Sequence, residues 1–362
     1  MMSAMDEMPP SYEEAKACAK YASAPCINEG YVPDDDVKDG IILPPTAPPI
    51  PEEEQRSPSV LNLPPITELD VREACLQYVS EHCCYGQKFA RDAEYTEIKN
   101  KCTFHYKLET FGEKRESVQR FAPYKGQPID GPENGPPPHP WSIQVQANTP
   151  FQDGKVQMEI PHTAYVKTCG TCVGNGRVRC SSCSGQGGST CWNCGGRGRD
   201  NNERCTSCDG TGRKRCWTCN GTGQETCDTC DRRGKLKHYR VLIVTWKNHI
   251  DHFVTETSSL PKELILEAGG RQLCRDENTR VFPIVDAQDM SVNMASSNLL
   301  AKHGRAFPNE MIRKQRHQLR AVPLTRIRYR WKNKDGEFYV YGFQNKVYFE
   351  SYPQKCCCCT CI

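Results

Sequence analysis

The sequence predicts an α+β fold, in which an elongated β-hairpin is inserted into a β-rich body behind a disordered, proline-rich amino terminus. Six Cys-x-x-Cys pairs stand at regular intervals in the middle of the chain. On both sides of them, apolar and polar residues alternate as they do in strands. The first 66 residues hold 12 prolines and clusters of acidic residues, a composition that buries too little apolar surface to fold.

These patterns divide the 362 residues into five segments. No run of about 18 apolar residues occurs, so we expect no membrane-spanning helix. The segments are a disordered tail (1–66), an α+β region (67–166), the cysteine-rich hairpin (167–236), a β-rich and helical completion of the body (237–354) and a cysteine-rich tail (355–362).

The region before the hairpin opens with a helix. Thr67 is placed to cap it, and its expected core residues are Leu69, Ala74, Leu76 and Val79. From residue 102 an apolar–polar alternation predicts a strand, which Gly112 is expected to turn into a second strand. Residues 141–161 predict two further strands.

The segments that flank the hairpin, 162–167 and 237–246, are expected to pair antiparallel, because a hairpin returns its ends to one place. Beyond them, residues 261–269 and 291–318 predict helices. Asp335-Gly336 predicts the turn of a last hairpin within residues 326–348.

The spacing of the cysteine pairs is palindromic: their first members are separated by 11, 11, 14, 11 and 11 residues. A chain folded back at residues 200–203 would bring the first pair beside the sixth, the second beside the fifth and the third beside the fourth. Each juxtaposition supplies four sulfurs, which suits one tetrahedral zinc ion. The predicted sites are Cys169, Cys172, Cys227 and Cys230 (site one); Cys180, Cys183, Cys216 and Cys219 (site two); and Cys191, Cys194, Cys205 and Cys208 (site three).

Glycines after the second cysteine of each pair permit the tight turn that two ligands three positions apart require. The sixth repeat departs from this pattern, because Arg232 stands where the first glycine belongs. We therefore expect site one to be the least secure of the three.

A disulfide framework is the main alternative to zinc. It needs an oxidising compartment, and the amino terminus shows no secretory signal. Zinc in a reducing compartment is favoured, with a cytoplasmic location expected and a nuclear one left open. Thiol–disulfide exchange by one pair is a weaker alternative, because no βαβ pattern surrounds the pairs.

The C-x-x-C-x-G-x-G repeats, over residues 168–235, resemble the cysteine-rich zinc domain of DnaJ-type (Hsp40) chaperones. That family has four repeats and two zinc ions, so this hairpin is extended by one layer. The His-Pro-Asp triplet of a J domain is absent. With its proline-rich start and β-rich body, the chain resembles the Ssu-two homolog family. The DnaJ-type resemblance implies a non-enzymatic, chaperone-like factor that binds unfolded or heat-shock proteins, and the Ssu-two homolog resemblance implies a role in tooth development.

Basic residues around the hairpin leave a nucleic-acid-binding regulator as an alternative. Each four-thiolate zinc centre carries a charge of about −2, which offsets much of this basic charge. Trp192 and Trp217 follow first cysteines and either anchor a partner or cover the hairpin, and covering is favoured. The basic residues are Arg177, Arg179, Arg197, Arg199, Arg213, Lys214 and Arg215.

Both tails carry candidate attachment motifs. Pro9, Pro10 and Tyr12 form a PPxY match, which predicts a WW-domain partner, although chance in a proline-rich tail explains it equally well. The carboxyl-terminal cysteines are candidates for lipidation and peripheral membrane association; the alternative is an exposed, oxidation-prone tail. They are Cys356, Cys357, Cys358, Cys359 and Cys361.

No catalytic constellation is present in the sequence, which has neither a phosphate-binding glycine loop with lysine nor a nucleophile elbow. Zinc held by four cysteines has no open position for water, so the three sites are expected to be structural. His249 and His252 are possible metal ligands, but a role in a strand or turn is favoured. We therefore predict no catalytic residues and no small-molecule substrate.

Overall fold

The computed structural model describes residues 40–45, 65–200, 203–256 and 259–355. The PPxY match at Pro9, Pro10 and Tyr12 lies outside these residues, as do the tail cysteines 356–361. Across the described ranges, no helix is both long enough and apolar enough to cross a membrane.

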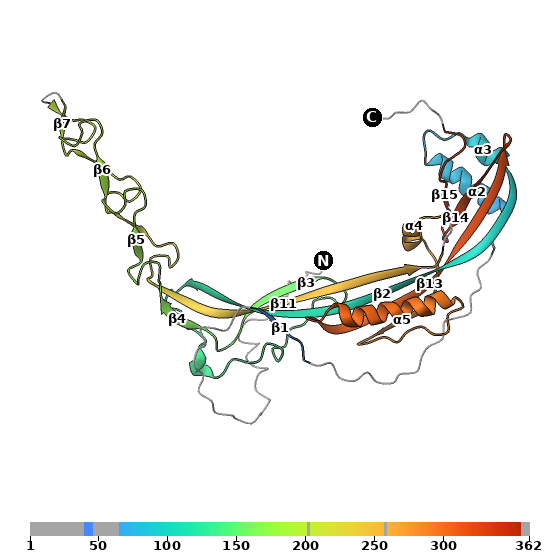
Figure 1. The fold of residues 1–362 in the computed structure, drawn as a ribbon, viewed down its shortest axis with the longest axis horizontal. Coiled ribbons are helices and arrows are strands. Elements are labelled where there is room, and N and C mark those ends of the chain that lie inside the picture. Colours follow the sequence, from blue (N-terminus) through green and yellow to red (C-terminus); the bar gives the residue numbers. More distant parts are fainter. Residues whose placement is uncertain (1–39, 46–64, 201–202, 257–258, 356–362) are drawn as a thin grey trace, which may run out of the picture. The chain divides into compact units, whose positions relative to one another are not determined.

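A nine-stranded sheet forms the body, and its three longest strands, β13, β2 and β11, run side by side in that order (Figure 1). All of its pairings are antiparallel. The prediction of a β-rich fold with few helices is therefore confirmed. The strands are β1 (Gly40–Ile42), β2 (Glu94–Pro123), β3 (Gly154–Glu159), β4 (Tyr165–Thr168), β11 (Lys235–Val254), β12 (Arg271–Asn278), β13 (Met311–Trp331), β14 (Lys334–Tyr341) and β15 (Lys346–Tyr348).

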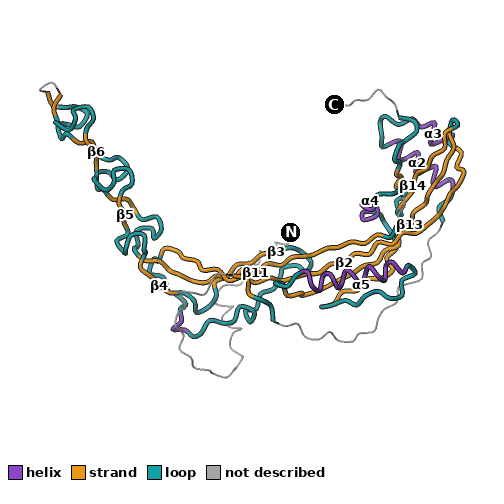
Figure 2. Tube along the Cα trace, viewed as in Figure 1, coloured by secondary structure: helices purple, strands orange, loops and turns teal. Residues whose placement is uncertain are grey.

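Helices pack against this sheet at separate places (Figure 2). Val292 of α5 joins Tyr106, Leu108 and Leu319 in one apolar cluster, and Phe89 of α3 joins another with Phe338. The helices are α2 (Glu68–Ser80), α3 (Gln87–Asp92), α4 (Lys262–Glu267) and α5 (Met290–Ala306), and Pro132–Asn134 forms a short 3₁₀ turn.

Thr67 caps α2 as predicted, with a reciprocal capping box to Asp70. The expected core face was wrong at one position, because Leu69 is 74% exposed. The buried positions Val71, Ala74, Cys75 and Val79 follow helical spacing, and residue 69 lies two positions before that stripe, on the opposite side of the helix.

Gly112 does not turn the chain. It lies inside the continuous 30-residue strand β2, opposite Lys247 on one side and Ile312 on the other. A β-carbon at this position would collide with the carboxylate of Glu310. The glycine thus makes room for a neighbouring side chain within an extended strand.

Residues 141–161 contain one strand, β3, rather than two. Arg115 explains part of the difference, because its buried guanidinium donates to the carbonyl oxygens of Pro140 and Ile143. Those carbonyls are satisfied by a side chain instead of a neighbouring strand. The segment before β3 is therefore a loop held against β2.

The predicted helix at 291–318 ends early, at Ala306, and the chain becomes strand β13 from Met311. Pro308 intervenes, and proline cannot continue a helix. Every second residue is then buried, at 315, 317, 319 and 321. This strand period is not visible in the sequence, because the stretch is rich in Arg, Lys, Gln and His.

The last hairpin turns at Lys332 and Asn333, which both have positive φ, and not at Asp335-Gly336. Gly336 instead stands in β14 opposite Tyr329. A β-carbon there would collide with the Tyr329 hydroxyl. The glycine accommodates an aromatic ring, and the turn forms three residues earlier.

The short strand β1 lies within the segment that the composition predicted to be disordered. It pairs with Arg115–Ser117 of β2, beyond Glu113, where the pairing of β13 with β2 ends. The indole of Trp141 donates to the carbonyl of Ile42. The apolar residues around Ile42 thus complete a strand edge that would otherwise stay unpaired.

Candidate metal centres

The cysteine-rich segment folds back on itself as the palindrome predicts. Its outgoing and returning halves pair as three short antiparallel ladders, β5 with β10, β6 with β9 and β7 with β8, and β5, β6 and β7 follow one another along it (Figure 1). The strands are β5 (Arg177–Arg179), β6 (Gly188–Thr190), β7 (Arg199–Asp200), β8 (Glu203–Arg204), β9 (Arg213–Arg215) and β10 (Gln224–Thr226).

The hairpin grows out of the body as expected. Strand β4 enters it, and the first residues of β11 leave it, with Tyr165 opposite His238 and Thr168 opposite Lys235. Antiparallel pairing of the two flanking segments is therefore confirmed, and it fixes the base of the hairpin to the long strand β11.

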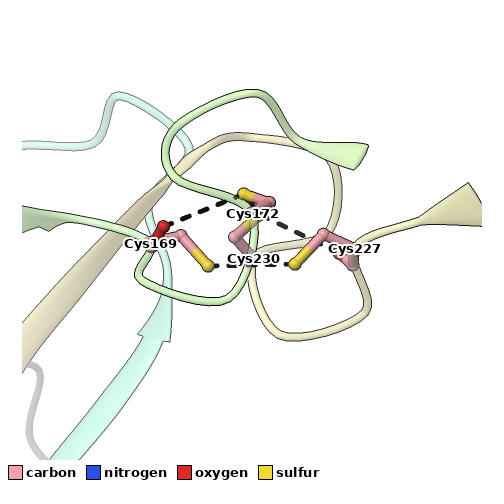
Figure 3. Close-up of side chains that lie close together, drawn as sticks. All are labelled: Cys169, Cys172, Cys227 and Cys230. Carbon is pink, nitrogen blue, oxygen red and sulfur yellow. Dashed lines mark hydrogen bonds between the residues drawn. The ribbon is translucent and has the colours of Figure 1, made fainter. Parts of the chain in front are cut away.

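Four sulfurs meet at each of three places, and the twelve cysteines are grouped as predicted, first pair with sixth, second with fifth and third with fourth. In site one, Cys169 Sγ lies 3.8 Å from Cys227 Sγ, and Cys172 Sγ lies 3.6 Å from Cys230 Sγ (Figure 3). The matching distances are 3.9 and 3.8 Å in site two and 4.0 and 3.8 Å in site three.

These separations fit a shared metal ion. For metal–sulfur bonds of about 2.3 Å, as in zinc sites, the edge of a regular tetrahedron is about 3.8 Å. A disulfide would bring two sulfurs to about 2.05 Å, and all cysteines within the described residues are free thiols. The three clusters can each hold a metal ion.

Each cysteine loop aims a backbone amide at sulfur. In all six repeats the second glycine of the motif donates its N–H to the second cysteine, as Gly187 does to Cys183 Sγ at 3.2 Å. Such bonds favour the thiolate, the form that a metal requires. The other donors are Gly176, Gly198, Gly212, Gly223 and Gly234.

The two halves of each cluster contact each other reciprocally. In site two, Cys180 N donates to Gly223 O and Cys216 N donates to Gly187 O, both at 2.9 Å. Corresponding pairs of bonds close the other two sites. Both halves are therefore held in register by backbone bonds as well as by their sulfurs.

Arg232 does not alter the sixth loop. It adopts φ 63°, in the left-handed region where the equivalent Gly174 has φ 85°. Gly234 still donates to Cys230 Sγ at 3.3 Å, so the four sulfurs of site one gather like the others. The departure from the motif is accommodated as backbone strain, because a β-carbon disfavours this conformation.

The thiols of a cluster do not all ionise together. Although burial opposes ionisation, hydrogen bonds lower the pKa of Cys169 in site one to about 7 and that of Cys219 in site two to about 6, whereas other thiols shift the opposite way. Burial, with proton sharing among the neighbouring thiols, raises the pKa of Cys230 to about 12. The pKa of Cys180 is raised to about 12, mainly by a hydrogen bond with Glu225 and secondly by burial. Burial also raises the pKa of Cys194 in site three. Four thiolates in one place repel one another, and a divalent cation compensates this charge.

Four arginines of the hairpin donate to carbonyl groups of the cysteine loops. Arg197 donates to Cys194 O at 3.4 Å, and the other three share one pattern. Arg179, Arg204 and Arg215 each precede the first cysteine of a repeat and donate to the carbonyl of the residue after the second cysteine, at 2.6, 3.0 and 2.6 Å. Of the four, Arg179, Arg197 and Arg215 belong to the set considered for nucleic acid. Their guanidinium groups stabilise the cysteine loops.

The two hairpin tryptophans are exposed, Trp192 by 77% and Trp217 by 86%. The expectation that they cover the hairpin is wrong. Each follows a first cysteine, on a loop whose turn carries the side chains outward, and Lys214 Nζ lies 5.0 Å from the Trp192 ring centroid.

His249 and His252 both lie in strand β11, three residues apart, and the structure does not bring them together at a metal site. His249 Nε2 is 2.7 Å from Glu310 Oε2, and His252 Nδ1 is 2.9 Å from His105 Nε2. The favoured reading of these histidines as strand residues agrees with this placement.

Known proteins resemble this chain over most of its length. A human protein named "Protein SSUH2 homolog" is 43% identical over 330 residues, which cover 89% of this chain and 88% of that protein. Its zebrafish counterpart (Danio rerio) is 41% identical over 326 residues, covering 88% and 90%. The chain belongs to the SSUH2 homolog family.

A mouse SSUH2 homolog is 46% identical over 244 residues, covering 67% of this chain and 72% of that protein. No family model matches the chain, and no solved structure matches it. This member of the SSUH2 homolog family thus carries three four-cysteine clusters that can bind metal on a β-rich body.

Sequence reasoning missed one group of ligand-type side chains, Cys274, Asp276 and His317, which lies in the body. The only signal in the sequence is Cys-x-Asp, two residues apart in a strand. His317 is 41 residues away from Asp276 and becomes its neighbour only through the pairing of β12 with β13.

Proposed function

We propose that the protein is a zinc-stabilised, non-enzymatic protein-binding factor of chaperone-like character. The observation that carries this proposal is the pair of exposed tryptophans, Trp192 and Trp217, on loops built around four-cysteine clusters. The cysteine loops would act as a rigid support for client contacts. The resemblance of the repeats to DnaJ-type zinc domains supports the same reading.

Zinc is the metal that this ligand set favours. Four thiolates in tetrahedral arrangement select zinc or an iron–sulfur cluster; edges of 3.6–4.0 Å suit one ion at the centre. All four positions are then taken by protein, which leaves none for substrate water. The sites would stabilise the hairpin instead of catalysing hydrolysis.

Client binding would use exposed apolar side chains. Besides the two tryptophans, Val173 is 78% exposed directly after Cys172. Large apolar groups held on a rigid loop lose little conformational entropy on binding, which favours contact with apolar segments of unfolded chains. The motifs at the two tails would determine where the protein is located. Tyr12 would recruit a WW-domain partner, and a lipidated carboxyl terminus would attach the chain to a cytoplasmic membrane surface.

Two alternatives are less well supported. A nucleic-acid-binding regulator would need free guanidinium groups, yet Arg179 and Arg215 are engaged with loop carbonyls. A thiol–disulfide oxidoreductase would have to oxidise cysteines that the backbone amides orient toward a common centre, and each turnover would open a cluster.

Suppression of the aggregation of chemically denatured citrate synthase tests client binding. We expect the reduced, zinc-loaded chain to lower light scattering at both low and high salt. Trp192→Ala with Trp217→Ala should weaken this several-fold while leaving the zinc content unchanged. Phe343→Ala is the matched control, because Phe343 is an exposed aromatic residue outside the hairpin.

Full activity of the tryptophan variant would refute the role of these residues in client binding. Binding of single-stranded RNA that falls steeply with salt would favour the nucleic-acid alternative. Pull-down from cells with and without Tyr12→Ala tests the partner at the amino terminus, where equal recovery of WW-domain proteins would discard it.

A further inference from the structure

Strands β12 and β13 place a cysteine, a carboxylate and a histidine together, away from the cysteine hairpin. Asp276 stands directly opposite His317 in the pairing of the two strands, and Cys274 opposite Leu319. Cys274 and Asp276 are two residues apart, so they share one face of β12. A register shift between Gln272 and Cys274 precedes them, and such irregularities commonly redirect a side chain near a functional site.

The distances between the ligand atoms match a metal centre. Cys274 Sγ lies 3.5 Å from Asp276 Oδ2, and the same oxygen lies 3.3 Å from His317 Nε2. Bonds of about 2.3 Å to sulfur and about 2.1 Å to oxygen and nitrogen give tetrahedral edges of about 3.6 Å for S–O and about 3.4 Å for O–N. The three ligand atoms all lie within 4.8 Å of one another.

A second residue orients the histidine. Tyr106, which is fully buried, has its hydroxyl 3.2 Å from His317 Nδ1. With Nδ1–H donating to this hydroxyl, Nε2 presents its lone pair toward Asp276 and Cys274. A partner of this kind on the second ring nitrogen is a regular feature of metal-binding histidines.

Burial and charge also agree with a metal ion. The His317 side chain is 2% exposed, whereas that of Asp276 is 32% exposed, so an ion can enter from the Asp276 side. One thiolate and one carboxylate balance a divalent cation completely. This contrasts with the four-thiolate clusters of the hairpin, whose net charge is about −2.

We propose that Cys274, Asp276 and His317 form a fourth metal site, which binds a zinc-class divalent ion through one sulfur, one oxygen and one nitrogen. Binding displaces the thiol proton of Cys274 to solvent. Three protein ligands leave the fourth tetrahedral position for water or an outside ligand, the arrangement that distinguishes reactive zinc sites from structural ones. The site lies in the body, so it does not depend on the function proposed for the hairpin.

Cadmium-113 NMR of the full-length, reduced chain loaded with ¹¹³Cd²⁺ tests this site without any mutation. Cadmium shifts depend strongly on the number of sulfur ligands. We therefore expect a resonance from the one-sulfur site, well separated from the signals of the four-sulfur clusters. A spectrum with signals from four-sulfur sites alone would overturn the proposal. A spectrum that lacks the four-sulfur signals would count against the hairpin sites only.

Variants then assign the resonance. Cys274→Ser and Asp276→Asn should each remove it and leave the four-sulfur signals in place. Cys102→Ser is the matched control, because Cys102 is also half-buried against the same apolar cluster and belongs to no ligand group among the described residues. A separate resonance that persists in both ligand variants would show adventitious binding elsewhere and would equally overturn the proposal.

Discussion

Gly187 packs against the carbonyl group of Gly221, so closely that a β-carbon on Gly187 would lie 2.5 Å from that oxygen. The relationship is reciprocal, since a β-carbon on Gly223 would lie 2.4 Å from the carbonyl oxygen of Gly185 on the opposite half. The second glycines of the motif are thus required by contact between the two halves as well as by positive φ. The same contacts bring each pair of cysteine loops close enough to share one metal ion.

We predict that Gly187→Ala destabilises the middle cluster by about 2 kcal/mol, from backbone strain at positive φ together with the collision. Chelator-driven release of one zinc ion should become at least tenfold faster. Gly170→Ala is the control, because Gly170 is also in a cysteine loop but has no atom within 4 Å of a β-carbon and no positive φ. Equal release rates in the two variants would contradict the packing role.

Arg232→Gly should strengthen site one. The arginine is held at φ 63°, which costs about 1 kcal/mol relative to glycine. One zinc ion should therefore be released severalfold more slowly by chelator. Arg233→Gly, at a neighbouring residue without positive φ, should give no such gain, and equal slowing in both variants would count against the strain.

Arg115→Leu is expected to destabilise the body by about 3–5 kcal/mol, because it breaks a buried ion pair. The Arg115 side chain is 2% exposed, and its Nε donates to Glu113 Oε1 at 2.6 Å. Denaturant unfolding measures the loss. Arg120→Leu, at an exposed position of the same strand, should change stability by less than about 0.5 kcal/mol, and a similar small effect at Arg115 would refute the prediction.

The ionised side chain of Glu109 should make the stability of the body sensitive to acid. Burial opposes its ionisation, but hydrogen bonds from Arg316 and Asn248 outweigh burial and lower the pKa of Glu109 from 4.5 to about 2. Its stabilisation is therefore present above about pH 4.5 and is lost as the pH falls toward about 2. Over this pH range, the melting temperature of the wild-type chain should fall more steeply than that of Glu109→Gln. Metal release at low pH contributes equally in both chains, so the difference between the two curves reports on Glu109. Parallel curves would contradict the assignment.

Periodicity and spacing in the sequence were sufficient to predict much of the structure of the hairpin. The palindrome of Cys-x-x-Cys pairs determines which sulfurs meet, because each pair is bound to a loop of fixed length and the two halves must stay in register. The pairing of Tyr165 with His238 follows from the same closure.

Long-range packing determines the features of the fold that local sequence patterns did not predict. Gly112 and Gly336 are typical turn residues, yet both lie in strands, where they make room for Glu310 and Tyr329. The polar stretch after Pro308 became a central strand because it pairs with β2 over nearly its whole length. Asp276 and His317 meet only through a register that local patterns do not contain.

Native mass spectrometry of the reduced, purified chain tests the three hairpin clusters most directly. A chain with Cys172→Ser, Cys183→Ser and Cys194→Ser, one change in each cluster, should carry three fewer zinc ions than the wild-type chain. Equal zinc content in the two chains, or disulfides among these cysteines in protein isolated from cells, would contradict zinc binding by the hairpin.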